Sequence, residues 1–379
     1  MDERVLAERL ITYDTSTSDG LRAAVGFVKG WLEARDVPVT GREFAGLPVV
    51  LADIGPPTGP CVILHGHVDV VPAHGDQFTP RIDGDRLIGR GAYDMKGGLA
   101  AMMCAVHDCV QNGKVRVRFI CVPDEESDNL DFRCTDALVQ EGLTGDFAIT
   151  GEPTDLHIGV QAKGVLAVRV EVSGIAAHGS TPWAGDNAIL KAYDVFRRIE
   201  TLRFSRESSD LFDRPSINVS RIVGGDAFNK VPDRCTMDVD IRYLPSQHAD
   251  EILADIRALE DVQIVKTFQR APARVSRANP FVRALREAVS ISLDDEARSI
   301  GRDGASDAIS FLQAGIPAVE FGPTGGCHHG PEEWVSIDSL ARYRQALRDF
   351  VLDLPGWLAQ MDAATVRAPL RAVDGGLAS

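Results

Sequence analysis

The chain has 379 residues, of which 44% are hydrophobic and 25% are charged, and its formal net charge is −15 at pH 7. This length favours two domains over one, and the composition is typical of a soluble globular protein. The charge argues against nucleic acid or an anionic membrane as a partner, because no basic patch is concentrated enough to pair with phosphates.

The seven cysteines are odd in number and scattered, and none forms a Cys-x-x-Cys pair. We therefore expect reduced, mostly buried thiols, as in a cytoplasmic protein. Residues 1–4 lack the basic start and apolar core of a signal peptide. No apolar run reaches the roughly 18 residues that a membrane-spanning helix needs. Together these features predict a cytoplasmic location.

The first part of the chain alternates helical and strand patterns. Helices are expected over residues 3–12, 21–34 and 97–110, and strands over residues 49–52, 62–64, 115–122 and 146–150. Strands separated by helical stretches predict the α/β class, with a mostly parallel sheet sandwiched by helices.

Near residue 163 the pattern changes. Strand, helix, strand, strand, helix and strand are expected, in that order, at residues 165–172, 187–202, 216–222, 235–243, 249–259 and 262–268. This βαββαβ order is typical of a ferredoxin-like domain. Because it lies between two α/β stretches, we predict a catalytic domain of residues 1–162 and 272–379, interrupted by an inserted domain of residues 163–271.

After residue 276 the α/β pattern resumes. Helices are expected at residues 280–293, 307–314 and 339–360, and a strand at residues 318–321. The tail, residues 361–379, has no strong periodicity, so no structure is assigned to it.

Histidines and carboxylates gather at five places, four of them just beyond apolar strand runs. The five segments are HGHVDVVP at 65–72, GRGAYDMKGG at 89–98, PDEESD at 123–128, GEPT at 151–154 and CHHGPEEWV at 327–335. In open α/β sheets, ligands bind beyond the carboxyl ends of the strands. Two histidines and several carboxylates at that edge predict a metal site, and therefore a metallohydrolase.

The residue types suggest how the roles divide. His67 and Asp69 project to the same side of an extended chain, where Asp69 can hold the second imidazole nitrogen. Asp94 precedes a helix in a glycine-rich loop, where it could bridge two cations or simply cap the helix. Glu125 and Glu126 could form a solvated acidic loop. Beside a metal, Glu126 would coordinate and Glu125 would take a proton from bound water.

Glu152 and a histidine of the last segment complete the candidate set. Glu152 and His329 each stand beside a turn-forming residue. Spacing alone does not decide between His328 and His329. His65 shares a face with His67, and we expect it to be a packed or hydrogen-bonded neighbour. Each segment is weak evidence alone, but the five together are strong evidence for a metal site.

These motifs, in this order over about residues 1–360, resemble the di-zinc exopeptidase and amidohydrolase family that contains acetylornithine deacetylase, succinyl-diaminopimelate desuccinylase, aminoacylase and glutamate carboxypeptidase. The resemblance implies two divalent metal ions, with zinc as the first choice and cobalt or manganese able to replace it. It implies one metal held by His67, Asp94 and Glu152, and a second held by Asp94, Glu126 and His329.

The resemblance also implies further roles in the catalytic domain. His329 is preferred over His328 because the family's last ligand often opens a His-x-Pro-acid-Glu-aromatic run, which residues 329–334 fit. Asp94 would bridge the metals, Asp69 would orient His67, and Glu125 would be the general base.

The inserted domain corresponds to the family's lid and carries GIAAHGSTPWAGDNAI at residues 174–189. Sequence chemistry alone makes His178 an exposed turn residue. In similar proteins the matching histidine reaches the active site of the other subunit and stabilises the oxyanion, which implies a homodimer through the lid. Asn229 and Arg242 resemble lid positions that hold substrate, although Arg242 could also be a solvent-facing strand residue. A guanidinium suits a substrate carboxylate, which it binds with two hydrogen bonds.

One position departs from the family pattern, which often has Gly-Thr-Ser-Asp where this chain has Gly-Ala-Ser-Asp at residues 304–307. The hydroxyl missing at Ala305 affects a substrate contact and not the metal site.

The implied mechanism is hydrolysis of a linear amide. Two metals share a hydroxide, Glu125 takes the proton of the water and passes it to the departing amine, and His178 with the metals holds the oxyanion. The predicted substrate is an N-acyl amino acid, as for a deacetylase or desuccinylase. The motifs do not separate this activity from that of a carboxypeptidase or dipeptidase acting on short peptides. A non-catalytic amino-acid or peptide-binding protein is a further alternative, opposed by the complete ligand set together with Glu125.

Overall fold

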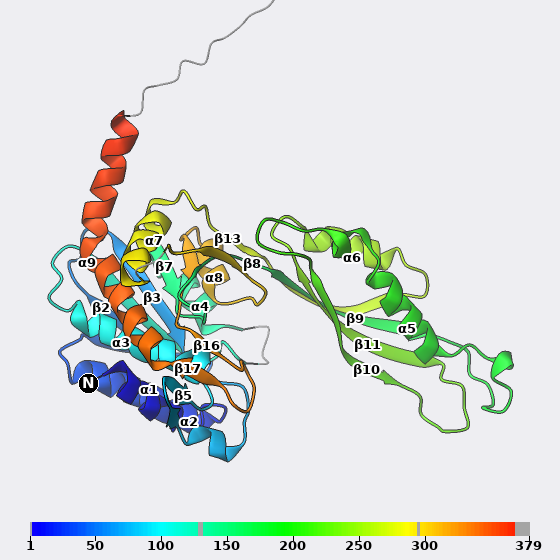
Figure 1. Ribbon diagram of the computed structural model, residues 1–379. Helices are drawn as coiled ribbons and strands as arrows, with labels where there is room; N and C mark the ends of the chain where they lie inside the picture. Colours follow the sequence, from blue (N-terminus) through cyan, green and yellow to red (C-terminus); the bar gives the residue numbers. More distant parts are fainter. Residues whose placement is uncertain (1, 128–131, 294–295, 368–379) are drawn as a thin grey trace, which may run out of the picture.

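The computed structural model describes residues 2–127, 132–293 and 296–367 (Figure 1). An α/β body carries both ends of the described chain, and a smaller body with an antiparallel sheet extends from one side of it. Among the described residues, no helix is both long enough and apolar enough to cross a bilayer.

The α/β body is built on a nine-stranded sheet with the order β1-β2-β6-β3-β7-β15-β8-β13, in which β14 also pairs with β8. Its centre is parallel and both edges contain antiparallel pairs, so the predicted fold class is confirmed. The strands are β1 (Val39–Phe44), β2 (Leu47–Ile54), β3 (Cys61–His67), β6 (Arg116–Val122), β7 (Phe147–Thr150), β8 (Ile158–Ala162), β13 (Ala273–Arg274), β14 (Ser299–Arg302) and β15 (Ala318–Glu320).

Helices cover both faces of this sheet. Along β3, Val62 and Leu64 pack into one hydrophobic core and Ile63 into another, because successive side chains of a strand point to opposite faces. The larger core includes residues of α1 (Glu3–Ile11), α2 (Ser18–Glu33), α3 (Gly97–Asp108), α7 (Pro280–Leu293) and α9 (Ile337–Arg367). The smaller core includes residues of α4 (Cys134–Gln140) and α8 (Ala308–Gln313). Both faces being buried explains why the central strands are continuous apolar runs.

The last helix is longer than predicted. In α9, the buried residues Leu340, Tyr343, Leu347 and Phe350 recur every three or four positions and pack against α3 and α7. The prediction of an end at residue 360 was wrong, because α9 continues through Pro355 to Arg367. Figure 1 shows this last part projecting away from the α/β body. The remainder of the tail, residues 368–379, lies outside the described residues.

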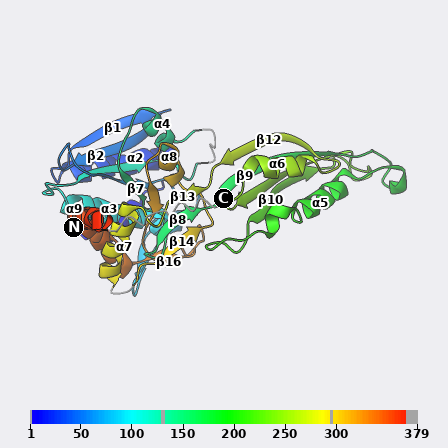
Figure 2. The same ribbon diagram turned by 90° about the horizontal axis from the view of Figure 1, so that it is seen from above.

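The smaller body has the predicted βαββαβ order. Its elements are β9 (Gly164–Ser173), α5 (Ala188–Ile199), β10 (Ser216–Gly224), β11 (Arg234–Tyr243), α6 (Ala249–Arg257) and β12 (Gln263–Arg270). The sheet order is β10-β11-β9-β12, with every pair antiparallel. Both helices lie on one face of this sheet (Figure 2). We place the domain limits at residues 162/163 and 271/272, between the last strand of one sheet and the first strand of the other.

One small sheet, which the sequence did not reveal, matters for the site. It has the order β16-β17-β5-β4, formed by β16 (Gly325–Gly326), β17 (Trp334–Ser336), β5 (Arg86–Ile88) and β4 (Arg81–Asp83). These strands are two or three residues long, too short to give a periodic pattern. Pairing of β17 with β5 brings the loop of residues 327–333 against the loop of residues 89–94.

Candidate metal centre

The candidate ligands converge because the parallel strands end level with one another. In the pairing of β3 with β6, His67 lies opposite Val122, and in the pairing of β3 with β7, His65 lies opposite Thr150. The segments that follow these strands therefore leave the sheet at one edge. They carry Asp69, the pair Glu125 and Glu126, and Glu152. This is the carboxyl edge at which the sequence placed the site.

His67 is fully buried and held at both ring nitrogens. Its Nδ1 lies 3.1 Å from the backbone carbonyl oxygen of Asp69 and 3.4 Å from Oδ1 of the same residue. Its Nε2 lies 3.0 Å from Oδ1 of Asp94 and 3.9 Å from Oε1 of Glu152. Asp69 thus fixes the ring, and the opposite nitrogen faces two candidate metal-binding carboxylates.

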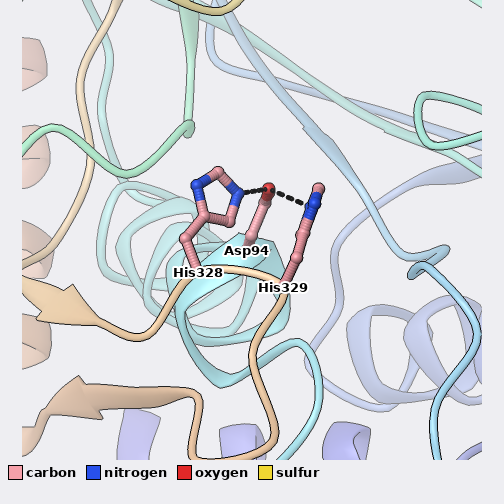
Figure 3. Close-up of side chains that lie close together, drawn as sticks. All are labelled: Asp94, His328 and His329. Carbon is pink, nitrogen blue, oxygen red and sulfur yellow. Dashed lines mark hydrogen bonds and ion pairs between the residues drawn. The ribbon is translucent and has the colours of Figure 1, made fainter. Parts of the chain in front are cut away.

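The other oxygen of Asp94 faces both histidines of the last segment. His328 forms a hydrogen bond through Nε2 to Asp94 Oδ2, and Nε2 of His329 lies 3.5 Å from the same oxygen (Figure 3). His329 Nε2 also lies 2.7 Å from Oε1 of Glu126. The spacing of the motif left His328 and His329 as alternatives. The structure shows that both rings face Asp94.

Among the residues that the structure describes, two groups of donor atoms are compact enough for an ion. His67, Asp94 and Glu152 form one group, and Asp94, His328 and His329 form the other, with the donor atoms of each group within 4.8 Å of one another. Asp94 belongs to both groups, as a bridging carboxylate requires. Glu126 joins the second group through its contact with His329.

The electrostatics fit a bound cation. Burial, followed by the charges of Asp94 and Glu125, raises the pKa of Glu152 well above the ordinary value of a glutamate. Burial also raises the pKa of Glu125, although the charge of His67 acts in the opposite direction. Within the described parts of the chain, Oε1 of Glu152 has no hydrogen-bond partner although it is buried. A divalent cation would satisfy this oxygen and offset the crowded carboxylates, and imidazole with carboxylate is a donor set that suits zinc.

Asp69 has a second role that the sequence did not reveal. Its Oδ1 accepts a hydrogen bond of 3.2 Å from the backbone N–H of Glu125, and its Oδ2 accepts one of 2.7 Å from the backbone N–H of Glu126. Asp69 therefore fixes His67 and both glutamates together. His65 is a buried, packed neighbour as expected, with Nε2 2.9 Å from Oγ1 of Thr135.

Glu333 supports the loop that carries Asp94, and sequence reasoning assigned it no role. Its Oε1 accepts hydrogen bonds of 3.0 Å from the backbone N–H groups of Tyr93 and Asp94. Its Oε2 accepts one of 2.5 Å from Arg90 Nη1, and Nη2 of Arg90 donates to the carbonyl of His329 at 2.9 Å. The buried pair of Arg90 and Glu333 thus ties the Asp94 loop to the His329 loop. Only the Glu-aromatic end of the last motif hinted at it.

We expect Glu333→Gln to weaken metal binding about 10- to 100-fold, the usual effect of removing a group that orients metal ligands. The glutamine amide would lose the ion pair with Arg90. Its NH2 group would also face N–H donors, from which it cannot accept a hydrogen bond. Metal titration followed by calorimetry measures the effect. Glu332→Gln is the matched control, because Glu332 is exposed and pairs with Arg81 at the surface. Equal metal affinity in the two variants would show that Glu333 does not support the centre.

The predicted lid residues fall into two separate places. Arg242 lines a cavity together with Glu125. His178 and Asn229 lie together, joined by a hydrogen bond of 2.7 Å from the N–H of Gly179 to the carbonyl of Asn229. They lie beyond Ser173, whereas the opposite end of β9 meets the α/β body, and ten strand residues span about 33 Å. Within one chain, His178 and Asn229 are therefore not brought to the metal centre.

Residues 63–353 match the model of peptidase family M20/M25/M40. The chain belongs to this family. It is therefore a metal-dependent amidohydrolase or metallopeptidase acting on linear amides, which confirms the predicted family and class of enzyme.

Alignments of this M20 protein with its relatives cover most of both chains. A succinyl-diaminopimelate desuccinylase of Stenotrophomonas maltophilia is 30% identical over 310 residues, which cover 74% of this chain and 80% of the relative. The same-named protein of Gluconacetobacter diazotrophicus is 28% identical over 376 residues, covering 93% and 96%. An M20 family metallo-carboxypeptidase from Sulfolobus solfataricus has the same fold, with a TM-score of 0.78 at 20% identity, covering 94% of this chain and 100% of that one.

Proposed function

We propose that this M20 enzyme hydrolyses the amide bond of an N-acyl amino acid, with Glu125 as the general base. The observation that carries the proposal is the position of Glu125, which stands next to Glu126 and also lines a cavity with Arg242. A substrate whose carboxylate contacts Arg242 would place its amide beside Glu125. The desuccinylase names of relatives at 28% and 30% identity favour an acylated amino acid over a short peptide.

We assign the metal ligands to two sites that share Asp94. His67 and Glu152 would complete one site, and His329 and Glu126 the other. His328 is a further candidate, because it contacts the same Asp94 oxygen as His329. Two divalent ions, with zinc as the first choice and cobalt or manganese as substitutes, suit this mixture of imidazole and carboxylate.

Bound ions would acidify a water molecule and polarise the scissile carbonyl. Glu125 accepts the proton of the attacking water and delivers it to the departing amine nitrogen. Asp69 keeps the base in place by accepting the backbone N–H of Glu125. Arg242 holds the carboxylate of the substrate with charge-assisted hydrogen bonds.

His178 would act across a homodimer formed through the lid. This part of the proposal is supported by the separation of His178 and Asn229 from the metal centre of their own chain. It is also supported by β10, the edge strand of the lid sheet, whose Ile222 and Val223 are 48% and 53% exposed. An unpaired edge strand with exposed apolar side chains can pair with a second copy of itself. In such a dimer, His178 of the partner would stabilise the oxyanion, and Asn229 would contact the substrate.

Metal analysis combined with a hydrolysis screen tests the proposal. The screen uses N-succinyl and N-acetyl amino acids together with dipeptides, on protein loaded with zinc, cobalt or manganese. We expect about two ions per chain and turnover of at least one acylated amino acid, with dipeptides slower. Preferred cleavage of dipeptides would replace the proposed substrate class by the peptidase alternative. A cytoplasmic location is also part of the proposal, and cell fractionation checks it.

A further inference from the structure

A second cavity opens beside Glu126 and extends toward the start of α2. Its volume is about 550 Å³. Asp69 and Glu126 of the candidate metal centre line one wall, and residues 15–18, where α2 begins, line another. The hairpin between β1 and β2 forms a third wall, to which Arg22 is tied by a hydrogen bond of 2.7 Å from its Nη2 to the carbonyl of Gly46. All of the lining residues belong to the catalytic domain.

Two cavities therefore adjoin the consecutive residues Glu125 and Glu126. Glu125 lines the cavity of about 180 Å³ that includes Arg242 of the lid, and Glu126 lines the larger one. Asp69 holds the backbone of both glutamates, so the two cavities meet at one fixed point. When the carboxylate of an N-acyl amino acid contacts Arg242 and its amide lies beside Glu125, the acyl group is the part that the larger cavity can receive.

The wall at the start of α2 holds a hydroxyl group that lacks a partner. Thr15 is 1% exposed, and its Oγ1 has no hydrogen-bond partner in the described parts of the chain. The nearby Thr17 differs, because its hydroxyl accepts from the N–H of Gly20 at 3.2 Å and donates to the carbonyl of Asp14 at 2.8 Å. A buried hydroxyl without a partner is unfavourable, so its place in the lining of a cavity points to a bound group as the partner.

Asp124 supplies a second unpartnered atom to the same cavity. This residue is 2% exposed, and its Oδ2 accepts a hydrogen bond of 2.8 Å from the backbone N–H of Cys134. Its Oδ1 has no hydrogen-bond partner among the residues that the structure describes. A carboxylate oxygen requires a donor, whereas the hydroxyl of Thr15 can donate or accept. The two residues together suit a group that carries both a donor and an acceptor.

The charges around the cavity favour a neutral group. Asp69, Asp124 and Glu126 contribute carboxylates to the lining, and Arg22 contributes an exposed guanidinium. A carboxylate on the ligand would be repelled by the unpartnered oxygen of Asp124. An ammonium group would be opposed by the N-terminus of α2, whose free N–H groups carry partial positive charge. A primary amide or a hydroxyl meets neither obstacle.

We propose that this cavity receives the acyl group of the substrate, and that Thr15 and Asp124 select an acyl chain that ends in a neutral hydrogen-bonding group. Both residues would then determine specificity on the acyl side of the amide, whereas Arg242 is assigned to the amino-acid side. This inference rests on the proposed function for the bond that is cleaved.

Four N-acyl-L-alanines with chains of similar length test this selection. Their acyl groups are glutaramoyl, which ends in a primary amide, glutaryl, which ends in a carboxylate, 5-aminopentanoyl, which ends in an ammonium group, and 5-methylhexanoyl, which ends in an isopropyl group. We expect kcat/KM to be at least about tenfold higher for the glutaramoyl probe than for each of the others. A smaller advantage over any of the three would overturn the proposal.

Two variants on different elements test the residues. Thr15→Val removes the hydroxyl with little change of shape, so the advantage should fall to about threefold or less. Asp124→Asn keeps an acceptor for Cys134 and places an NH2 group where Oδ1 stands, so the glutaryl probe should gain at least about tenfold relative to the glutaramoyl probe. The matched control is Thr40→Val, because Thr40 is an exposed residue of β1 outside the lining of the cavity.

The readout is a ratio of kcat/KM values for two probes on the same sample. Such a ratio does not depend on the fraction of active enzyme, so partial loss of metal or of folded protein cannot imitate the effect. Thr40→Val should keep the wild-type ratio. An advantage of the glutaramoyl probe that survives substitution of both Thr15 and Asp124 would overturn the assignment, and either variant suffices if the other does not fold.

Binding of the acyl products separates this inference from the proposed function. Calorimetry on the metal-loaded protein compares glutaramate, glutarate and 5-methylhexanoate, the acids that hydrolysis would release. We expect glutaramate to bind about tenfold more tightly than the other two, with the preference lost in Thr15→Val and kept in Thr40→Val. If that pattern appears while no probe is hydrolysed, the cavity assignment stands and the proposed reaction is wrong. If the probes are hydrolysed while the three acids bind equally, the reaction stands and the cavity assignment is wrong.

Discussion

Replacing Glu125 by alanine should lower kcat about 100- to 10,000-fold without loss of metal, the range found when a general acid–base residue is removed. Glu125 would move the proton from the attacking water to the departing amine. The surroundings of its carboxylate favour this role. Burial and the nearby charges of Asp307, Glu126 and Asp94 raise its pKa, so it holds a proton more readily than an ordinary glutamate. Steady-state kinetics and metal analysis on the same samples measure the two quantities.

Two further variants make the Glu125 result interpretable. Glu125→Gln keeps the shape of the side chain but cannot accept a proton, so it should be as inactive as the alanine variant. Glu260→Ala, at an exposed lid position, should leave both activity and metal content unchanged. A Glu125→Ala enzyme that turns over at the wild-type rate would remove Glu125 from the mechanism. Loss of metal from the Glu125→Ala variant would instead indicate that Glu125 is a metal ligand.

A mixture of two inactive variants should regain about a quarter of the wild-type activity. Alone, Glu125→Ala lacks the base, and His178→Ala should lose about 100- to 1,000-fold in kcat, as for removal of one oxyanion donor. In a mixed dimer, the His178→Ala chain keeps Glu125 and would receive His178 from the Glu125→Ala chain. One of the two active sites is then complete. Random exchange at equal amounts makes half of the dimers mixed, which gives about a quarter of the sites.

This experiment is possible because Glu125 lies near the first residues of the lid strand β9, whereas His178 lies beyond its last residue. Light scattering on the same mixtures establishes the dimer, and activity is followed against the time of subunit exchange. Activity that stays at the sum of the two parent variants would mean that His178 does not act across the interface. Full activity of His178→Ala alone would remove it from catalysis altogether.

Much of the fold could be predicted because it depends on local patterns. The apolar runs around Val62 and Phe147 become parallel strands buried on both faces, and the alternation along β9 becomes a sheet covered on one face by two helices. The order of these patterns was enough to predict an inserted ferredoxin-like domain. The edge strand β1 was missed because it is mostly exposed, and the end of α9 was missed because it has no apolar stripe.

The sequence by itself determined the candidate ligands, since few arrangements other than a metal site place histidines and carboxylates just beyond several buried strands. It left the last histidine ambiguous on spacing, because a loop has no fixed periodicity from which a side chain's direction can be read. Only the pairing of β17 with β5 decided that both His328 and His329 face Asp94.

The support for the site was decided by tertiary structure alone. The contact of Glu333 with the Asp94 loop joins residues about 240 positions apart, and the cavity beside Glu125 is lined by Arg133 of one domain and Arg242 of the other. Such contacts depend on how elements pack and in what register strands pair, and neither is encoded in the residues near any one motif. The sequence therefore determined which chemistry this protein can perform, and the folded structure decided how that chemistry is held in place.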